Sequence, residues 1–370
     1  MGDTLPPLSL ETWLKTIENE YLEDYVCSGG SAVKVVTGTG VQLSQVVSSL
    51  HSLAKTKDYF SVHLDPSKKD DFGKRPDLHQ INKFFFKVTE NVNWKASAAV
   101  QAKQYLETQG IVLEERRELG QLEQIALDNG RDAQDLLNQY QRELATPQIR
   151  DTRLSIEFRT AVTALGRSLL IPDAVTPTTE EVLLGWFGGK AFPGASSALK
   201  KVQIYDRINL TNARPMLASF CRWLPQIAQS GLVVTLDFRP YEYKKIAKGK
   251  RQQEQLELIR AAAMRGASPE EIGKIAEEHD SNQPEIFYSD AAYMQMLTMV
   301  RRFIDEIDYF ERFLLVILTS PNFYKDKTLD PSVKRCYFDY DALQTRIGQE
   351  VHDARNANPA ASLVNLGGVQ

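Results

Sequence analysis

Hydrophobic residues along the chain follow two patterns: short continuous runs, and longer stretches in which they recur with a helical period. The short runs predict buried β-strands at 32–37, 59–65, 232–237 and 313–318. The longer stretches predict helices at 10–26, 41–54, 211–229, 290–312 and 339–356. Because strands alternate with helices, the pattern indicates an α/β fold with a largely parallel sheet.

The remaining segments are helical or irregular. Residues 76–170 have helical spacing and no competing strand pattern. Thr178 is expected to cap the next helix, because Glu181 stands three residues later, as in a capping box. Residues 244–283 are polar and helical, and the tail 356–370 shows no pattern of a regular element.

The order of these elements predicts one α/β core with helical additions rather than two independent domains. The expected parts are the start of the core, a helical region, the rest of the core with a helical insert, and a final helix with its tail. They correspond to residues 1–75, 76–230, 231–338 (insert 244–285) and 339–370.

Charge is nearly balanced over the 370 residues, with 44 Lys and Arg against 48 Asp and Glu and a formal net charge of -4. A nucleic-acid site would therefore have to be a local basic patch. The three cysteines lie far apart and the five histidines are scattered, so no metal site is predicted. No apolar run approaches the roughly 20 residues of a membrane span, and the N-terminus has no signal-peptide pattern. We expect a cytoplasmic protein without membrane contact.

A glycine turn follows the first predicted strand and precedes a helix, which is where P-loop proteins hold phosphate. In their motif G-x-x-x-x-G-K-[ST], backbone N–H groups cradle the phosphates, the lysine reaches them and the hydroxyl binds magnesium. The corresponding octet here is Gly38-Thr39-Gly40-Val41-Gln42-Leu43-Ser44-Gln45. Leu43 replaces the second glycine, Ser44 the lysine and Gln45 the hydroxyl residue. From the motif alone, an ordinary strand-to-helix turn is the favoured interpretation.

Asp237 ends the strand LVVTLD, as the magnesium-binding acid of P-loop ATPases ends its strand. The catalytic glutamate that usually follows is absent, because Phe238 and Arg239 come next. Glu242 lies nearby and is not assigned as a base, and a capping or solvated acid is an equally good interpretation of Asp237. The candidate remnant of a nucleotide site therefore comprises Gly38, Thr39, Gly40, Ser44, Gln45 and Asp237.

Several segments in order along the chain resemble the ATP-binding subunits of BREX phage-defence systems, a P-loop ATPase family. The segments that carry the resemblance are YLEDYV at 21–26, SGGSAVKVVTG at 28–38, EVLLGWFG at 181–188, NARPML at 212–217, LVVTLD at 232–237, LLVILTSPNFYKD at 314–326, YDALQTRI at 340–347 and NPA at 358–360. The resemblance implies a P-loop (AAA+/ASCE-like) core whose two chemical motifs have lost their reactive residues.

This resemblance favours a catalytically inactive ATPase homologue that acts as a structural or regulatory subunit of a BREX-like defence complex. It implies weak or absent binding of ATP and magnesium, other defence proteins as partners, and the alternative of a homo-oligomer. A divergent active ATPase is a second interpretation, in which Lys34 or a neighbouring chain supplies the missing charge. A DNA-binding adaptor without nucleotide is the third.

A local basic patch after the acid-ended strand is the candidate nucleic-acid site, because lysines can follow a phosphate backbone and tyrosines can stack on bases. It comprises Tyr241, Tyr243, Lys244, Lys245, Lys248, Lys250 and Arg251. A solvated loop is the favoured alternative. The following segment 256–279 predicts a helical hairpin with Ser268 as an N-cap, whose acidic second helix is unsuited to reading DNA.

Overall fold

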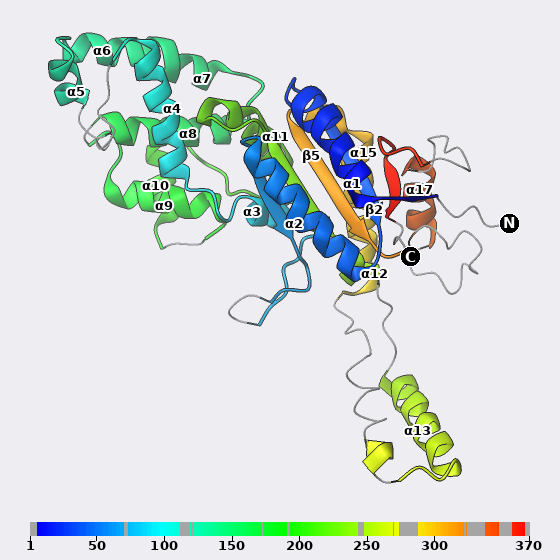
Figure 1. Cartoon of the computed structure of the whole chain (residues 1–370). Helices are drawn as coiled ribbons and strands as arrows, with labels where there is room; N and C mark the ends of the chain where they lie inside the picture. The colour runs from blue at the N-terminus through cyan, green and yellow to red at the C-terminus, as the bar shows by residue number, and fades with distance from the viewer. Residues whose placement is uncertain are drawn as a thin grey trace.

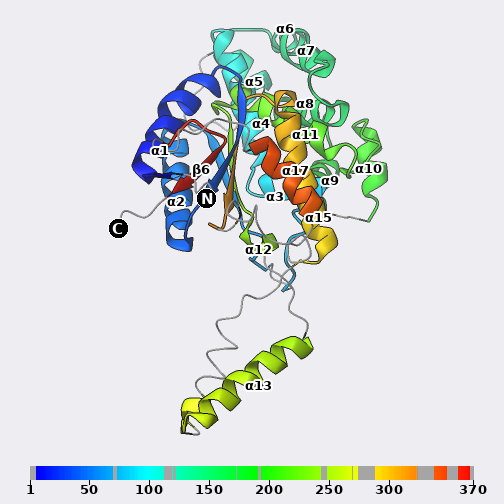
Figure 2. The same ribbon diagram turned by 90° about the vertical axis from the view of Figure 1, so that its right-hand side faces the viewer.

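The computed structural model describes residues 6–69, 73–111, 119, 122–171, 173–190, 193–242, 248–268, 270–273, 288–321, 323, 337–347 and 357–366. These residues form an α/β fold in which helices cover both faces of a six-stranded, wholly parallel sheet (Figures 1 and 2). The strand order across the sheet is β1-β6-β2-β5-β4-β3. The predicted α/β class with a parallel sheet is confirmed.

The four strands predicted from apolar runs are present close to their expected limits. They are β2 (Ser31–Thr37), β3 (Phe60–Leu64), β4 (Leu232–Asp237) and β5 (Phe313–Thr319). Every residue of β4 and β5 is buried, because these strands lie inside the sheet and helices cover both of its faces. Their hydrophobicity is therefore continuous rather than alternating.

Two strands were not predicted. The C-terminal segment expected to lack regular structure contains β6 (Leu363–Leu366), which pairs with β2 and with the short strand β1 (Pro7–Leu8). Leu363 faces one core, and Val364 and Leu366 face the other. The expectation for the tail was wrong because four apolar residues gain their stability only from partners more than 300 positions away.

One face of the sheet is covered by the helices nearest the N-terminus. They are α1 (Leu10–Thr16), its continuation as the π-helix η1 (Ile17–Tyr25), and α2 (Gly40–Thr56). Trp13, Ile17 and Leu50 are fully buried against strand residues such as Val316. Figure 2 shows α1 and α2 on one side of the sheet, and α15 (Asp290–Asp305) and α17 (Tyr337–Ile347) on the other.

The opposite face is covered by helices that come from distant parts of the chain. They are α3 (Ile81–Val88), α11 (Ala213–Trp223), the 3-10 helix η3 (Leu224–Ile227), α15 (Asp290–Asp305), the 3-10 helix η4 (Ile307–Tyr309) and α17 (Tyr337–Ile347). Phe84, Phe220 and Phe303 are buried in this core. Part of the predicted final helix lies outside the described residues.

A helical region with its own apolar cluster follows α3. It contains α4 (Trp94–Thr108), α5 (Leu122–Asp128), α6 (Ala133–Tyr140), η2 (Gln141–Ala145), α7 (Thr146–Arg150), α8 (Ile156–Leu170), α9 (Pro177–Phe187) and α10 (Ala195–Lys201). The predicted cap of α9 is corrected: Thr176 is the N-cap, and its hydroxyl accepts from Thr179 N. Pro177 at the first helical position fixes this start.

The helical insert contains α13 (Lys248–Met264), which stands apart from the sheet and its helices in both views (Figures 1 and 2). The predicted hairpin turn is present at Gly266, whose φ is +81°. The capping box also forms, since Ser268 and Glu271 exchange hydrogen bonds. Among the described residues, no helix combines the length and the apolar character that crossing a bilayer requires.

Candidate functional site

The candidate site lies at the carboxyl ends of β2, β4 and β5, where open α/β sheets commonly bind ligands. Helix α2 begins at Gly40, and only two residues separate it from the end of β2 at Thr37. Thr39 caps α2 in a capping box with Gln42: Thr39 N donates to Gln42 Oε1 at 2.8 Å, and Gln42 N donates to Thr39 Oγ1 at 3.4 Å. Gly38 N donates to the Thr319 carbonyl at 3.3 Å. Three N–H groups of this turn are therefore already bonded within the protein.

The residues of the degenerate motif have ordinary helical roles. Leu43, in the place of the second glycine, is fully buried in the core between α2 and the sheet. Ser44 is exposed, and its hydroxyl donates to the Gly40 carbonyl at 2.9 Å. Gln45 is also exposed. The stretch that corresponds to the middle of the P-loop motif is thus a helix rather than a loop.

Asp237 is bound by a cation of its own chain. Arg239 donates from Nε to Asp237 Oδ1 at 2.9 Å and from Nη2 to Oδ2 at 2.6 Å, and its backbone N–H also reaches Oδ1 at 3.1 Å. The third guanidinium nitrogen, Nη1, lies 3.4 Å from the position a Cβ on Gly40 would take. The guanidinium is therefore bound to the end of β4 and lies beside the start of α2. Such a forked ion pair is among the stronger hydrogen-bonded arrangements in proteins.

Glu242, at the end of the short helix α12 (Arg239–Glu242), also lies near the carboxyl ends of the strands. Its carboxylate accepts hydrogen bonds from the backbone N–H of Ser320 at 3.0 Å and from the Ser320 hydroxyl. Burial raises the pKa of Glu242 to about 7, although the bonds from Ser320 oppose that shift. From the sequence, Glu242 lies near the site but has no assigned role. In the structure it binds Ser320, which follows β5.

Replacing Glu242 by Gln should make the protein progressively more stable than wild type as the pH rises from about 4.5 to about 7. In this window the unfolded wild-type chain has lost a proton that the folded chain retains, so wild-type stability falls with increasing pH. Gln cannot ionise and removes that loss, which amounts to at most about 3 kcal/mol. Urea unfolding at several pH values measures the difference.

The matched control for this substitution is Glu181→Gln, which changes an exposed glutamate on α9. Its unfolding free energy should stay close to that of wild type, because an exposed side chain away from special features contributes little to stability. If the free energies of unfolding of wild type and Glu242→Gln change with pH in parallel, the folded protein does not retain the Glu242 proton in this pH window.

Two histidines share one hydroxyl beneath α2. Thr235 Oγ1 lies 2.9 Å from His51 Nε2 and 2.9 Å from His63 Nδ1. A threonine hydroxyl has one hydrogen to donate, so one imidazole accepts it and the other donates to the oxygen. Burial, with the neighbouring His63, lowers the pKa of His51 to about 4, and burial also lowers the pKa of His63. Both rings are neutral at pH 7 and act as structural hydrogen-bonding groups.

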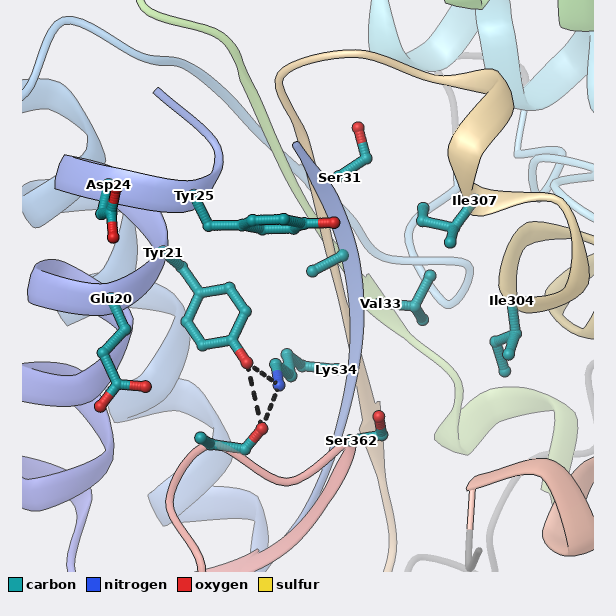
Figure 3. Close-up of a pocket in the computed structure, with 12 residues that line it drawn as sticks. Glu20, Tyr21, Asp24, Tyr25, Ser31, Val33, Lys34, Ile304, Ile307 and Ser362 are labelled. Carbon is teal, nitrogen blue, oxygen red and sulfur yellow. Dashed lines mark hydrogen bonds between the residues drawn. The ribbon is translucent and has the colours of Figure 1, made fainter. Parts of the chain in front are cut away.

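Lys34 does not face the glycine turn. Its side chain is almost completely buried, and its ammonium donates to the Tyr21 hydroxyl (Figure 3) and to the carbonyl oxygens of Ala360 and Ala361. The ammonium also lies 4.2 Å from the centroid of the Tyr21 ring. Lys34 therefore joins η1, β2 and the segment before β6, and its charge is directed away from the candidate nucleotide site.

The structure separates the residues of the predicted basic patch. Tyr241 is fully buried, stacked on Tyr288 with ring centroids 4.0 Å apart, so its ring is not available to a nucleic-acid base. Tyr243, Lys244 and Lys245 lie outside the described residues. The other members, Lys248, Lys250 and Arg251, lie in α13.

Sequence reasoning missed Arg239 and the His51–His63 pair. The spacing Asp-x-Arg at the end of a strand was the available signal for Arg239, whereas nothing local links His51 to His63. Within the described part of the chain, no group of three or more His, Cys, Asp or Glu side chains is placed to hold a metal ion. Comparison with protein families, curated proteins and solved structures finds no match to the chain.

Proposed function

We propose that this protein is a P-loop-type ATPase homologue without ATPase activity, which acts as a structural or regulatory subunit of a phage-defence complex. The Asp237–Arg239 ion pair carries the first part of the proposal. Both carboxylate oxygens of the acid that would hold magnesium are bound by a guanidinium that also lies against the start of α2. A cation of the chain itself is thus bound to the acid that would hold magnesium and lies beside the turn where phosphate would bind.

The turn between β2 and α2 supports the same proposal. A phosphate cradle needs several free N–H groups on a loop that wraps the anion. Here α2 starts at the third position of the octet, and the N–H groups of Gly38, Thr39 and Gln42 are bonded internally. The alternative of a divergent ATPase that uses Lys34 is disfavoured, because three oxygen atoms of the protein surround the Lys34 ammonium.

The second part, a role in a defence complex, rests on the resemblance of ordered segments to BREX ATP-binding subunits. The β2–α2 turn and Asp237 both lie at the carboxyl ends of the parallel strands, and β5 lies between their two strands. P-loop ATPases also bring their phosphate-binding turn and magnesium acid to the carboxyl ends of parallel strands. The arrangement is therefore compatible with a P-loop ancestry in which the scaffold remains and the chemistry is lost.

Incubation of the purified full chain with ATP and magnesium should release no more phosphate than a protein-free control, because Ser44 stands in place of the motif lysine and Asp237 is already bound by Arg239. Saturable release that falls in Gln45→Ala, or in an Asp237→Asn variant with an unchanged circular dichroism spectrum, would contradict the proposal. An active P-loop ATPase measured in parallel is the positive control.

The role in defence is tested separately in the host. Deletion of the gene should raise the efficiency of phage plating, and the wild-type gene should restore protection. A Ser44→Ala, Gln45→Ala double variant should protect equally well, since both side chains are exposed and the proposed function does not require ATP hydrolysis. Loss of protection in that variant with a normal protein level would argue for a working nucleotide site.

A further inference from the structure

A small cavity of about 170 Å³ lies between α3, α9 and the segment that precedes α11. Its apolar walls include Phe86 and Trp186, and three cationic side chains line it: Lys83, Lys190 and Arg207. Among the described residues that line it, none is acidic. Figure 1 shows α9 and α10 beside α3, away from the end of the sheet that carries Asp237.

A glycine turn at the end of α9 positions Lys190. Gly189 N donates to the Trp186 carbonyl at 3.0 Å and Lys190 N to the Gly185 carbonyl at 2.8 Å, the hydrogen bonds of a Schellman motif. Gly189 has a φ of +68°, and a Cβ there would lie 2.5 Å from the Phe86 ring. Only glycine fits this turn, which packs on Phe86 and places Lys190 at the cavity.

The other two cations come from separate elements that are also fixed. Lys83 belongs to α3, and its ammonium lies 5.9 Å from the centroid of the Phe86 ring. Trp186 Nε1 donates to the Asp206 carbonyl at 3.0 Å, which ties the segment carrying Arg207 to α9. Three distant parts of the chain thus converge on one cavity with the same sign of charge.

These cations differ from neighbouring lysines, which are neutralised within the protein. Lys87 pairs with Glu90 and Lys95 pairs with Glu180. Among the residues that the structure describes, no carboxylate forms an ion pair with any of the three cavity cations. The exposed acids Glu181 and Asp206 neighbour lining residues in sequence but do not line the cavity. Three like charges around one small space favour binding of an anion.

We propose that this cavity binds a phosphate group, independently of the function proposed above. Its volume corresponds to about five or six water molecules at roughly 30 Å³ each, enough for a phosphate group with part of its hydration. The Arg207 guanidinium offers the fork that matches two phosphate oxygens, and the lysines add point charges. Either a nucleic-acid backbone or a small phosphate ester supplies such a group. Tyr205 is 72% exposed two residues from Arg207 and offers a ring to a base.

The test compares two double variants of the full chain that remove equal charge. Lys83→Gln with Lys190→Gln changes the cavity, and Lys15→Gln with Lys55→Gln changes exposed lysines of α1 and α2. Pyrophosphate binding is measured by calorimetry. Binding of a fluorescein-labelled oligothymidylate of about 20 nucleotides is measured by anisotropy between about 50 and 200 mM salt. The cavity variant should bind at least about tenfold more weakly than wild type, and the control within about twofold.

The two ligands distinguish the sources of phosphate. Oligonucleotide binding that weakens in the cavity variant, with a salt slope lower by about one to two, identifies a nucleic-acid backbone as the ligand. Saturable pyrophosphate binding that is lost in the same variant, without oligonucleotide binding, identifies a small phosphate ester. The proposal is overturned if wild type binds neither ligand, or if the cavity and control variants bind with equal affinity.

Discussion

Ending the chain after Ser362 should lower the free energy of unfolding by about 5 kcal/mol or more. This truncation removes β6, whose Leu363, Val364 and Leu366 are buried on the two faces of the sheet. Burial of each such side chain contributes about 1.5–3 kcal/mol. The loss also removes the backbone pairs between β6 and β2 and leaves β1 without its partner strand. Urea unfolding followed by tryptophan fluorescence measures the change.

Two further variants keep this prediction testable if the truncated chain fails to fold. A chain that ends after Leu366 retains β6 and should unfold within about 1 kcal/mol of the full chain. The single substitution Leu363→Ala should cost about 2–5 kcal/mol, as expected for a buried leucine. An unchanged urea midpoint for the chain ending after Ser362 would mean that β6 does not contribute to the stability of the sheet.

Replacing Arg239 by Ala should destabilise the protein by about 3–5 kcal/mol, the cost of leaving a buried carboxylate without its counter-ion. The side chain of Asp237 is 9% exposed, and Arg239 is bound to both of its oxygens. In a working magnesium site, one carboxylate oxygen would instead bind the metal. Removal of a nearby arginine would then change the free energy of unfolding only slightly. Thermal and urea unfolding of the purified variant give the value.

The control for this prediction is the double variant Asp237→Asn, Arg239→Ala. It should recover most of the lost stability, because removing both charges leaves no uncompensated ion in the site. Arg239→Lys should be intermediate, since a lysine keeps the charge and loses the fork. Equal destabilisation by Arg239→Ala in the presence and absence of the Asp237 charge would show that the arginine acts through packing alone.

The candidate site was only partly predictable from sequence. Its location followed from local patterns, because a glycine turn after one apolar strand and an acid after another both fall at carboxyl ends of parallel strands. The sequence also showed that Leu43, Ser44 and Gln45 replace the glycine, lysine and hydroxyl residue of the P-loop motif. The sequence did not reveal that Arg239 turns back onto Asp237, because that depends on where the α12 backbone leaves β4. Nor did it reveal that Ser320, after another strand, binds Glu242.

The predicted nucleic-acid patch illustrates the limit of composition. Tyr241 lies in a polar stretch of the chain but is fully buried and stacked on Tyr288, which is 47 positions away. The cavity cations Lys83, Lys190 and Arg207 are dispersed over more than 120 positions, so no short segment of the sequence contains them as a basic patch. Their charge becomes local only when α3 packs beside α9.

The sequence by itself determined the elements whose stability is local or periodic. Continuous apolar runs specified β2 to β5, and helical spacing specified α1, α2, α11 and α15, because each pattern repeats within one element. Tertiary structure alone decided β6, the position of Arg239 beside the start of α2, the shared hydroxyl of His51 and His63, and the cavity lined by Lys83, Lys190 and Arg207. Each of these depends on the strand register and helix packing that bring distant residues together, which no local pattern encodes.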